Sequence, residues 1–376
     1  MAWLPSFLRR FFSNRRSVVR SAVRSEFVVR CGSSPSSLVV EVDADAASGQ
    51  DFCLAYSGQS LHVIAERPIV GGESALRIWL GAARSRVSPS SLVLKTQPYV
   101  DMVAPIPASY DTYLSSSIGK ILRADIKKAR GQGWGLEETR ELSHYESFYR
   151  QVFVPYTVKV HGPQGHIPSL DQFLKQGKKL SLLRVMKAGV TLGGTFLLSS
   201  SGHRQLRNWR IGIAPECWED QKLSTLVAIA LNSRVVERAI QQNFREASFG
   251  LSPAVLNHGN TFMKLKWGCS PRPADGPFYF AEIVGQSGRD FLGCKPLIHF
   301  RGNEVIGIVA LESSASVTPS AISEMINRLA SSGLAEVLVW VNSEGAALVD
   351  ELRRWPHWSN VCCPVRFENR LEDLRL

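Results

Sequence analysis

The chain contains 376 residues, of which 44% are apolar and 20% charged, and its formal net charge is +11. This length predicts two or three domains, and the apolar fraction is ordinary for a soluble globular protein. The absence of any run of 18 apolar residues argues against a membrane-spanning helix, and the Gly and Pro content argues against a fibrous or low-complexity chain.

The N-terminal tail, residues 1–25, is basic and aromatic. Residues 1–30 hold seven Arg and one Glu, and apolar side chains recur at helical spacing among them. A segment of this kind can lie in an anionic membrane interface. One expectation is therefore a cytoplasmic protein held on the inner face of the plasma membrane. The alternatives are a passive basic tail and an organelle transit peptide, since Arg9 and Arg10 interrupt any secretory signal.

The next region, residues 26–96, predicts short strands, because apolar β-forming runs alternate with Ser, Gly and Pro clusters. Residues 97–110 contain three Pro and predict a linker between domains.

Residues 111–284 form the predicted central domain, in which helices come first and strands follow. A basic helix is expected within 115–130, with Gly131 as its end. Further helices are expected at 141–153 and 169–177. The later elements are two strands that turn at Lys187–Gly189, a third strand at 205–214, a long helix at 223–243, and strands at 245–251 and 277–284.

The C-terminal segment, residues 291–376, alternates strands with helices, and one helix begins at Thr318–Pro319. Its elements are too few for an independent core. We therefore expect this α/β half-domain to pack on residues 26–96.

Common catalytic motifs are missing from the sequence. It has no dinucleotide-binding glycine motif after a strand, no P-loop, no nucleophile elbow and no zinc-protease motif. The eight His have no metal-ligand spacing, so no metal site is expected. The seven Cys include no C-x-x-C pair and favour a reducing compartment over a disulfide framework.

The order of segments within 110–270 resembles a known family. Helical SSSIGKILRADIKKARGQGW and FYRQVFVPYT precede the hairpin strand GVTLGGTFLL, RNWRIGIAPE precedes a long helix, and SFGLSP and TFMKLKWG follow. This pattern resembles the FemAB-like acyltransferases of the GNAT superfamily. The resemblance implies an α+β or α/β fold with a central mixed sheet flanked by helices. A second, degenerate subdomain of this type would be formed by the N- and C-terminal segments.

The resemblance also implies where an activated donor binds. The superfamily opens a gap between two central strands, where backbone groups hold the donor. Here the implied donor-binding strand contains Leu192, Gly193, Gly194 and Thr195, although the paired glycines are also typical of a tight packing point. The pyrophosphate loop of the superfamily is replaced by PECWEDQKLS, whose three acids would repel a phosphate or simply favour the N-terminus of the following helix.

Two residues are candidates for catalysis. The family ends in a Phe, Lys, Trp-Gly motif, and Lys264 keeps its spacing to Trp267, although Lys266 is an alternative. Lys264 would stabilise negative charge or hold a phosphate. His258 is the nearest candidate base, and Asn260 and Trp267 are candidate substrate contacts. Each has a structural alternative, a surface lysine and a turn histidine.

Four further polar residues are candidates for substrate binding. Period-two alternation places Asn208 and Arg210 on one face of a strand, where they would contact a carboxylate or phosphate, and turns Trp209 into the core. Lys127 and Lys128 on the basic helix would contact phosphates, or form a solvated helix face.

Together these features predict an N- or O-acyltransferase acting on a cell-envelope or polysaccharide precursor, with acyl-CoA as donor substrate and no permanently bound cofactor. The acceptor would be a small molecule or a lipid-linked saccharide. Two alternatives stay open, an aminoacyl-tRNA-dependent transferase and an inactive scaffold of the same fold. The nearly neutral body of the chain argues against tRNA as a partner.

Overall fold

The computed structural model describes residues 23–31, 34–43, 76–80, 91–161, 167–177, 180–200, 205–311, 319–329, 333–341, 350, 354 and 363–368. The chain divides into two compact units. Unit 1 comprises Met1–Asp101, Leu251–Met263 and Ser270–Leu376, and unit 2 comprises Met102–Gly250 and Lys264–Cys269. Most of the basic tail, residues 44–75 of the region predicted to contain short strands, and much of the C-terminal segment after residue 341 lie outside the described residues.

Unit 2 is built on a mixed sheet, as the sequence predicts. Its strand order is β11-β5-β10-β9-β8-β7-β6, of which β11 belongs to unit 1. Strands β6 to β9 are antiparallel neighbours, whereas β10 runs parallel to β9. The strands are β5 (Tyr99–Pro105), β6 (Gly135–Thr139), β7 (Ser181–Lys187), β8 (Val190–Ser200), β9 (Gln205–Ile213), β10 (Glu246–Pro253) and β11 (Ser270–Pro273).

The hairpin between β7 and β8 turns where the sequence predicts. Ala188 and Gly189 have φ angles of 49° and 81°. Positive φ at both central residues is the geometry of a two-residue turn whose twist matches that of the flanking strands.

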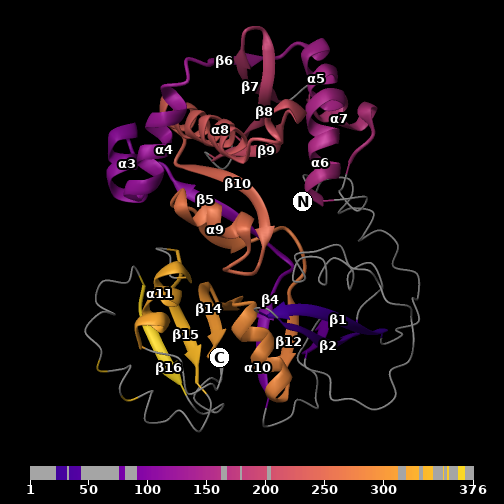
Figure 1. Cartoon of the computed structure of the whole chain (residues 1–376), viewed down its shortest axis with the longest axis vertical. Coiled ribbons are helices and arrows are strands. Elements are labelled where there is room, and N and C mark those ends of the chain that lie inside the picture. The colour runs from indigo at the N-terminus through magenta and orange to yellow at the C-terminus, as the bar shows by residue number, and fades with distance from the viewer. Residues whose placement is uncertain are drawn as a thin grey trace. The chain divides into compact units, whose positions relative to one another are not determined.

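Helices cover both faces of this sheet (Figure 1). Helix α8 packs on β7, β8 and β9, whereas η1, a π-helical turn, and α6 pack on β9 from the opposite face. The helices of this region are α3 (Tyr110–Ser117), α4 (Lys120–Arg130), α5 (Leu142–Phe148), η1 (Tyr149–Phe153), α6 (Val154–His161), α7 (Leu170–Gly177), η3 (Pro215–Cys217), α8 (Gln221–Gln241) and α9 (Gly259–Lys266).

The core on the η1 side is aromatic. Phe196 of β8 meets Tyr145, Phe148 and Phe173 with ring centroids 4.8, 5.7 and 5.1 Å apart, close to perpendicular in each pair. Gly194 makes this possible, because a Cβ there would lie 2.8 Å from the Phe148 ring. The paired glycines are therefore packing points.

The basic helix is confirmed as α4, which packs against α8. Its buried face holds Leu122, Ile126 and Ala129, and Gly131 follows its last residue, as expected. Gly119 precedes α4, while Ser109 caps the separate helix α3 by accepting from the Thr112 amide.

The segment predicted as a linker, residues 97–110, contains strand β5, so its linker character is wrong, although a boundary between the two units, after Asp101, falls within it. Val100 to Ala104 are buried. The three Pro lie at positions 98, 105 and 107, before the strand, at its last residue and beyond it. They bound the strand without interrupting its ladder, which is where Pro is tolerated.

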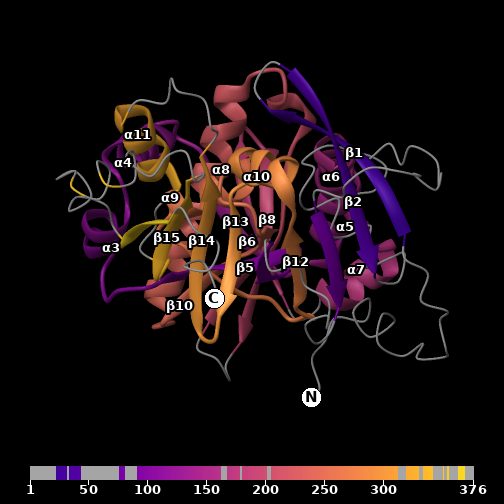
Figure 2. The same cartoon turned by 90° about the horizontal axis from the view of Figure 1, so that it is seen from below.

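Unit 1 contains two sheets among its described residues, both visible from below in Figure 2. One has the order β1-β2-β3-β12-β4 and the other β13-β14-β15-β16. The strands are β1 (Val23–Cys31), β2 (Ser34–Asp43), β3 (Leu76–Leu80), β4 (Leu92–Thr96), β12 (Tyr279–Ile283), β13 (Leu297–Arg301), β14 (Glu304–Ala310), β15 (Glu336–Trp340) and β16 (Val365–Glu368).

The end expected for the central domain, residue 284, is also wrong. Strand β12 pairs antiparallel with both β3 and β4 and so belongs to the sheet of the N-terminal strands. Unit 1 thus joins N- and C-terminal segments, and its nature as a second GNAT-like subdomain stays a prediction. Its helices include α10 (Gly285–Cys294) and α11 (Pro319–Leu329), and α11 begins at the expected Pro.

Three buried cysteines in the described residues are free thiols: Cys217, Cys269 and Cys363. Cys294, by contrast, is disulfide-bonded, which differs from the expectation of reduced cysteines. Within the same residues, no group of His, Cys, Asp and Glu is placed to hold a metal ion. No helix found there is both long and apolar enough to span a bilayer.

Candidate functional site

The candidate site lies in unit 2, where β9 and β10 separate. Their parallel ladder contains only three pairs and ends at Arg207 and Ser248, although β9 continues to Ile213 and β10 to Pro253. From Asn208 onward, β9 is paired with β8 but no longer with β10. We call this stretch, Asn208–Ile213, the open edge of β9.

Gly250 lies at the point of separation. Its φ is +78°, and a Cβ there would lie 3.3 Å from the Asn208 carbonyl oxygen. Its amide donates to the Ser248 hydroxyl at 3.2 Å instead of continuing the ladder. Glycine is needed at such a position, because its backbone adopts the left-handed region freely and approaches the neighbouring strand closely.

The side chain of Lys264, on α9, contacts the backbone where the two strands separate. Its Nζ donates to the Gly250 carbonyl oxygen at 3.0 Å, and the side chain is partly buried. Lys266 is exposed. Of the two lysines that the motif offers, the structure thus brings Lys264 to the separation of the two strands.

A polar network backs β9 on its α8 face. The Thr195 hydroxyl hydrogen-bonds the buried Asn208 side-chain oxygen and lies 2.9 Å from the Arg210 carbonyl oxygen. The Asn208 amide donates to Asn232 of α8 at 3.4 Å. Sequence reasoning missed Asn232. The signal available was its polar side chain among the apolar residues of a long helix.

The prediction that Asn208 and Arg210 share a face is wrong, because β9 contains a β-bulge. Phe196 is opposite Arg210 and Leu197 is opposite Asn208, so Trp209 is the additional residue. A bulge interrupts period-two alternation. Asn208 therefore reaches α8, while the Arg210 guanidinium lies 5.0 Å from the Trp209 ring and 5.7 Å from the Phe153 ring on the other face.

Arg210 is a cation without an anion. No described carboxylate pairs with it, its Nε is buried without a hydrogen-bond partner, and burial lowers the pKa of the guanidinium to about 10. Close by, Gly212 allows η1 to approach β9, since a Cβ there would lie 3.2 Å from the Phe153 Cα.

The predicted donor-binding residues are not on an open strand. Leu192, Gly193, Gly194 and Thr195 lie on β8, which is paired with β7 on one side and β9 on the other. A Cβ at Gly193 would lie 2.7 Å from Val227 of α8. Because the backbone groups of β8 are used by its neighbours, the free edge belongs to β9 instead.

Trp267 is a core residue, so its predicted contact with substrate is wrong. It is 1% exposed, lies 5.9 Å from the Phe249 ring, and its carbonyl oxygen accepts a hydrogen bond from the Tyr113 hydroxyl. Burial raises the pKa of Tyr113 far above its ordinary value.

His258 and Asn260 belong to unit 1, whereas Gly250 and Lys264 belong to unit 2. His258 lies directly before α9, and Asn260 lies in its first turn. The His258 Nδ1 accepts a hydrogen bond from the Asn260 backbone amide at 3.2 Å. This is the geometry of a helix cap, so the histidine has the turn role that the sequence left open.

Lys127 and Lys128 are exposed on α4, and Lys128 pairs with Asp125 at 3.1 Å. Their contact with phosphates stays a prediction. In the acidic turn before α8, the Asp220 carboxylate accepts from the Lys222 and Leu223 amides at 2.9 and 3.0 Å. Asp220 is thus the N-cap of α8. Its carboxylate accepts hydrogen bonds from two backbone amides that would otherwise be free to bind a pyrophosphate.

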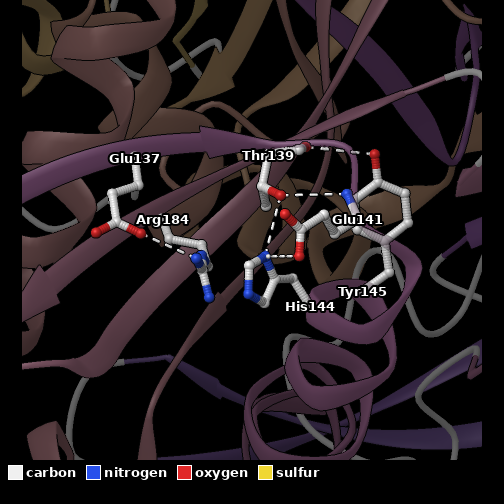
Figure 3. Close-up of polar contacts among 6 residues, drawn as sticks. All are labelled: Glu137, Thr139, Glu141, His144, Tyr145 and Arg184. Atoms are coloured by element: carbon white, nitrogen blue, oxygen red, sulfur yellow. Dashed lines mark hydrogen bonds and ion pairs between the residues drawn. The ribbon is translucent and has the colours of Figure 1, made fainter.

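A second polar cluster joins β6, β7 and α5 (Figure 3). The Thr139 hydroxyl accepts from the Glu141 amide at 3.1 Å and lies 3.0 Å from the His144 Nδ1, while the Glu141 carboxylate lies 3.6 Å from that same nitrogen. Since both contacts use one ring atom, no proton relay runs through this histidine. Arg184 and Glu137 form a 2.9 Å cross-strand ion pair, so the cluster fixes the edge strand and the start of α5.

Comparisons with known proteins give structural neighbours only. No protein-family model and no curated protein sequence matches the chain. FemX is 11% identical with a TM-score of 0.39, over 73% of this chain and 87% of its own. L-PGS from Bacillus licheniformis is 12% identical with a TM-score of 0.36, over 70% and 83%. The PaiA N-acetyltransferase from Thermoplasma acidophilum, solved with coenzyme A, is 12% identical with a TM-score of 0.28, over 40% and 99%.

Proposed function

We propose that the chain transfers an acyl or aminoacyl group from an activated donor to an amine or hydroxyl group. The observation that carries this proposal is the early end of the β9–β10 ladder beside Lys264. The family that the motifs resemble uses a gap of this kind for its donor. An extended donor containing amides can add to the open edge of β9 through strand-type hydrogen bonds.

The reaction needs a positioned nucleophile and a stabilised oxyanion more than it needs a strong base. Attack on an ester or thioester carbonyl places negative charge on the carbonyl oxygen, and a fixed cation nearby stabilises that charge. Lys264 has this role in the proposal, since its ammonium is held at Gly250 where the two strands part.

The acidic turn bears on the choice of donor. Asp220 uses the first free amides of α8, and Glu216 and Glu219 add negative charge beside them. This favours a donor whose phosphates do not bind at that turn. Aminoacyl-tRNA is therefore the second candidate donor beside acyl-CoA, and a cell-envelope or polysaccharide precursor is the proposed acceptor.

The test supplies both donor classes. Purified protein is incubated with a panel of acyl-CoAs, with thiol release as the readout, and with labelled aminoacyl-tRNA and an amine acceptor, with product formation as the readout. Transfer from either donor supports the proposal and names the donor. Absence of turnover from both would leave the inactive scaffold as the correct description.

Substitution of Lys264 tests the residue assignment. Lys264→Ala is expected to lower kcat about 100-fold, the effect of removing one oxyanion-stabilising group. Lys266→Ala is the matched control, since Lys266 is exposed on the same helix, and should retain the wild-type rate. An unchanged kcat in Lys264→Ala, with Tm also unchanged, would remove Lys264 from the mechanism.

A further inference from the structure

Arg210 differs from the ion-paired arginines of unit 2. The arginines with described ion pairs, Arg130, Arg150, Arg184, Arg234 and Arg238, contact carboxylates at the surface or between elements. No described carboxylate does this for Arg210. The undescribed stretches of unit 2, residues 162–166, 178–179 and 201–204, contain no acidic residue that would supply one.

The surroundings of Arg210 are apolar and aromatic. The guanidinium lies beside the Trp209 and Phe153 rings at 5.0 and 5.7 Å, and its Nε is buried without an acceptor. Aromatic faces support a cation but do not accept its N–H groups in the manner of a carboxylate. An unpaired charge in such a place destabilises the fold, and a bound anion would remove that cost by pairing with the guanidinium.

The position of Arg210 fits a ligand in the proposed site. It lies on the open edge of β9, two residues beyond Asn208, and the bulge at Trp209 turns it to the η1 face. The residue is partly exposed as a whole, whereas its Nε is buried. A guanidinium offers paired N–H groups that match the oxygens of a carboxylate or phosphate.

We propose that Arg210 binds an anionic oxygen pair, a carboxylate or a phosphate, on the molecule that occupies the open edge of β9. Anion binding itself stands on the unpaired guanidinium. The assignment of that anion to a transferase substrate rests on the proposed function.

The experiment measures binding without turnover. The Tm of the full chain is followed by differential scanning fluorimetry with rising inorganic phosphate, with rising acetate, and with chloride at equal ionic strength. Wild-type Tm should rise with phosphate or acetate beyond chloride, as a ligand that binds the native state requires. The more effective anion identifies the group. No rise above chloride with either anion would overturn the proposal.

Variants locate the effect. Arg210→Met removes the charge at similar length and should abolish the anion response while raising the Tm of the free protein, because an unpaired buried charge is lost. A structural role predicts the reverse, a lower Tm. If Arg210→Met does not fold, Arg210→Gln is used instead, and its Tm response to phosphate and acetate is compared with that of wild type. Arg150→Gln, an exposed arginine in η1, is the charge-matched control and should respond like wild type.

The outcomes separate this proposal from the proposed function. An Arg210-dependent response to phosphate or acetate supports the binding site even if no donor is turned over. A response that persists in both Arg210 variants contradicts the site even if the protein is an active transferase.

Discussion

At the scale of single residues, similar side chains acquire different roles from their surroundings. Asn208 and Arg210 are two residues apart on β9, yet one completes a buried hydrogen-bond network with Thr195 and Asn232 while the other is an unpaired cation. His258 caps a helix, whereas His299 of β13 is buried in unit 1. Residue type alone therefore does not separate structural from functional roles.

His299 makes stability depend on pH. Burial lowers its pKa from 6.5 to about 4, and its Nδ1 accepts from the Lys95 amide at 2.9 Å, which fixes the neutral form. In the unfolded chain the His299 imidazole is protonated below about pH 6.5, whereas in the folded chain it is protonated only below about pH 4. This contribution is thus complete above pH 6.5 and is lost progressively as the pH falls, by about 2 kcal/mol at pH 5.

Urea unfolding at pH 7 and pH 5 measures this loss. His299→Asn keeps an acceptor near the Lys95 amide but cannot be protonated, so its free energy of unfolding should fall less between the two pH values. An equal fall in wild type and variant would show that other groups cause the acid sensitivity.

At the scale of elements, close backbone approach shapes the central strands. Gly193 and Gly194 of β8 and Gly212 of β9 each allow a helix or a side chain to approach the sheet. These contacts hold α8 on one face and α5 and η1 on the other. The open edge of β9 lies between those two layers, so the packing glycines position the candidate site without forming it.

Gly193→Ala should destabilise the protein by about 1–3 kcal/mol, the usual cost of overpacking a core. The added Cβ would lie 2.7 Å from Val227 and 3.0 Å from the Gly212 carbonyl oxygen. Gly259→Ala is the control, because a Cβ there meets no atom within 4 Å and alanine favours a helix. Thermal unfolding compares them, and equal Tm values would contradict the tight packing of β8 on α8.

At the scale of the whole molecule, the chain passes between the two units several times. Unit 2 takes most of its residues from Met102–Gly250 but also needs Lys264–Cys269, after an excursion into unit 1. The short returning segment carries Trp267, which is 1% exposed, and Lys264 of the candidate site. Core and site in unit 2 are therefore completed by residues that are distant along the sequence.

A fragment of residues 102–250 should fail to unfold cooperatively, because it lacks Trp267 and leaves Phe249 and Tyr113 without their partner. A fragment of residues 102–269 keeps that tryptophan and should show a sharper thermal transition by circular dichroism. A cooperative transition in the shorter fragment would show that the returning segment is dispensable for the core of unit 2.

The sequence by itself determined the local elements of unit 2. Periodic apolar residues and a terminal glycine predicted α4, the Ala188–Gly189 turn predicted the β7–β8 hairpin, and a long apolar stripe predicted α8. These features depend on neighbours within a few residues, so the pattern of side chains is sufficient to specify them. The motif that resembles the FemAB-like enzymes also led to Lys264.

Only the tertiary structure decided which strand is open and which residues face it. The β9–β10 ladder ends because two segments about 40 residues apart diverge, the bulge at Trp209 depends on pairing with β8, and Trp267 is buried by Phe249 and Tyr113. Strand pairing and burial are set by residues distant in sequence, and periodicity cannot report a distant partner. That is why the open edge lies on β9 and not on β8, the strand predicted to bind the donor, and why Arg210 faces aromatic rings without an anion.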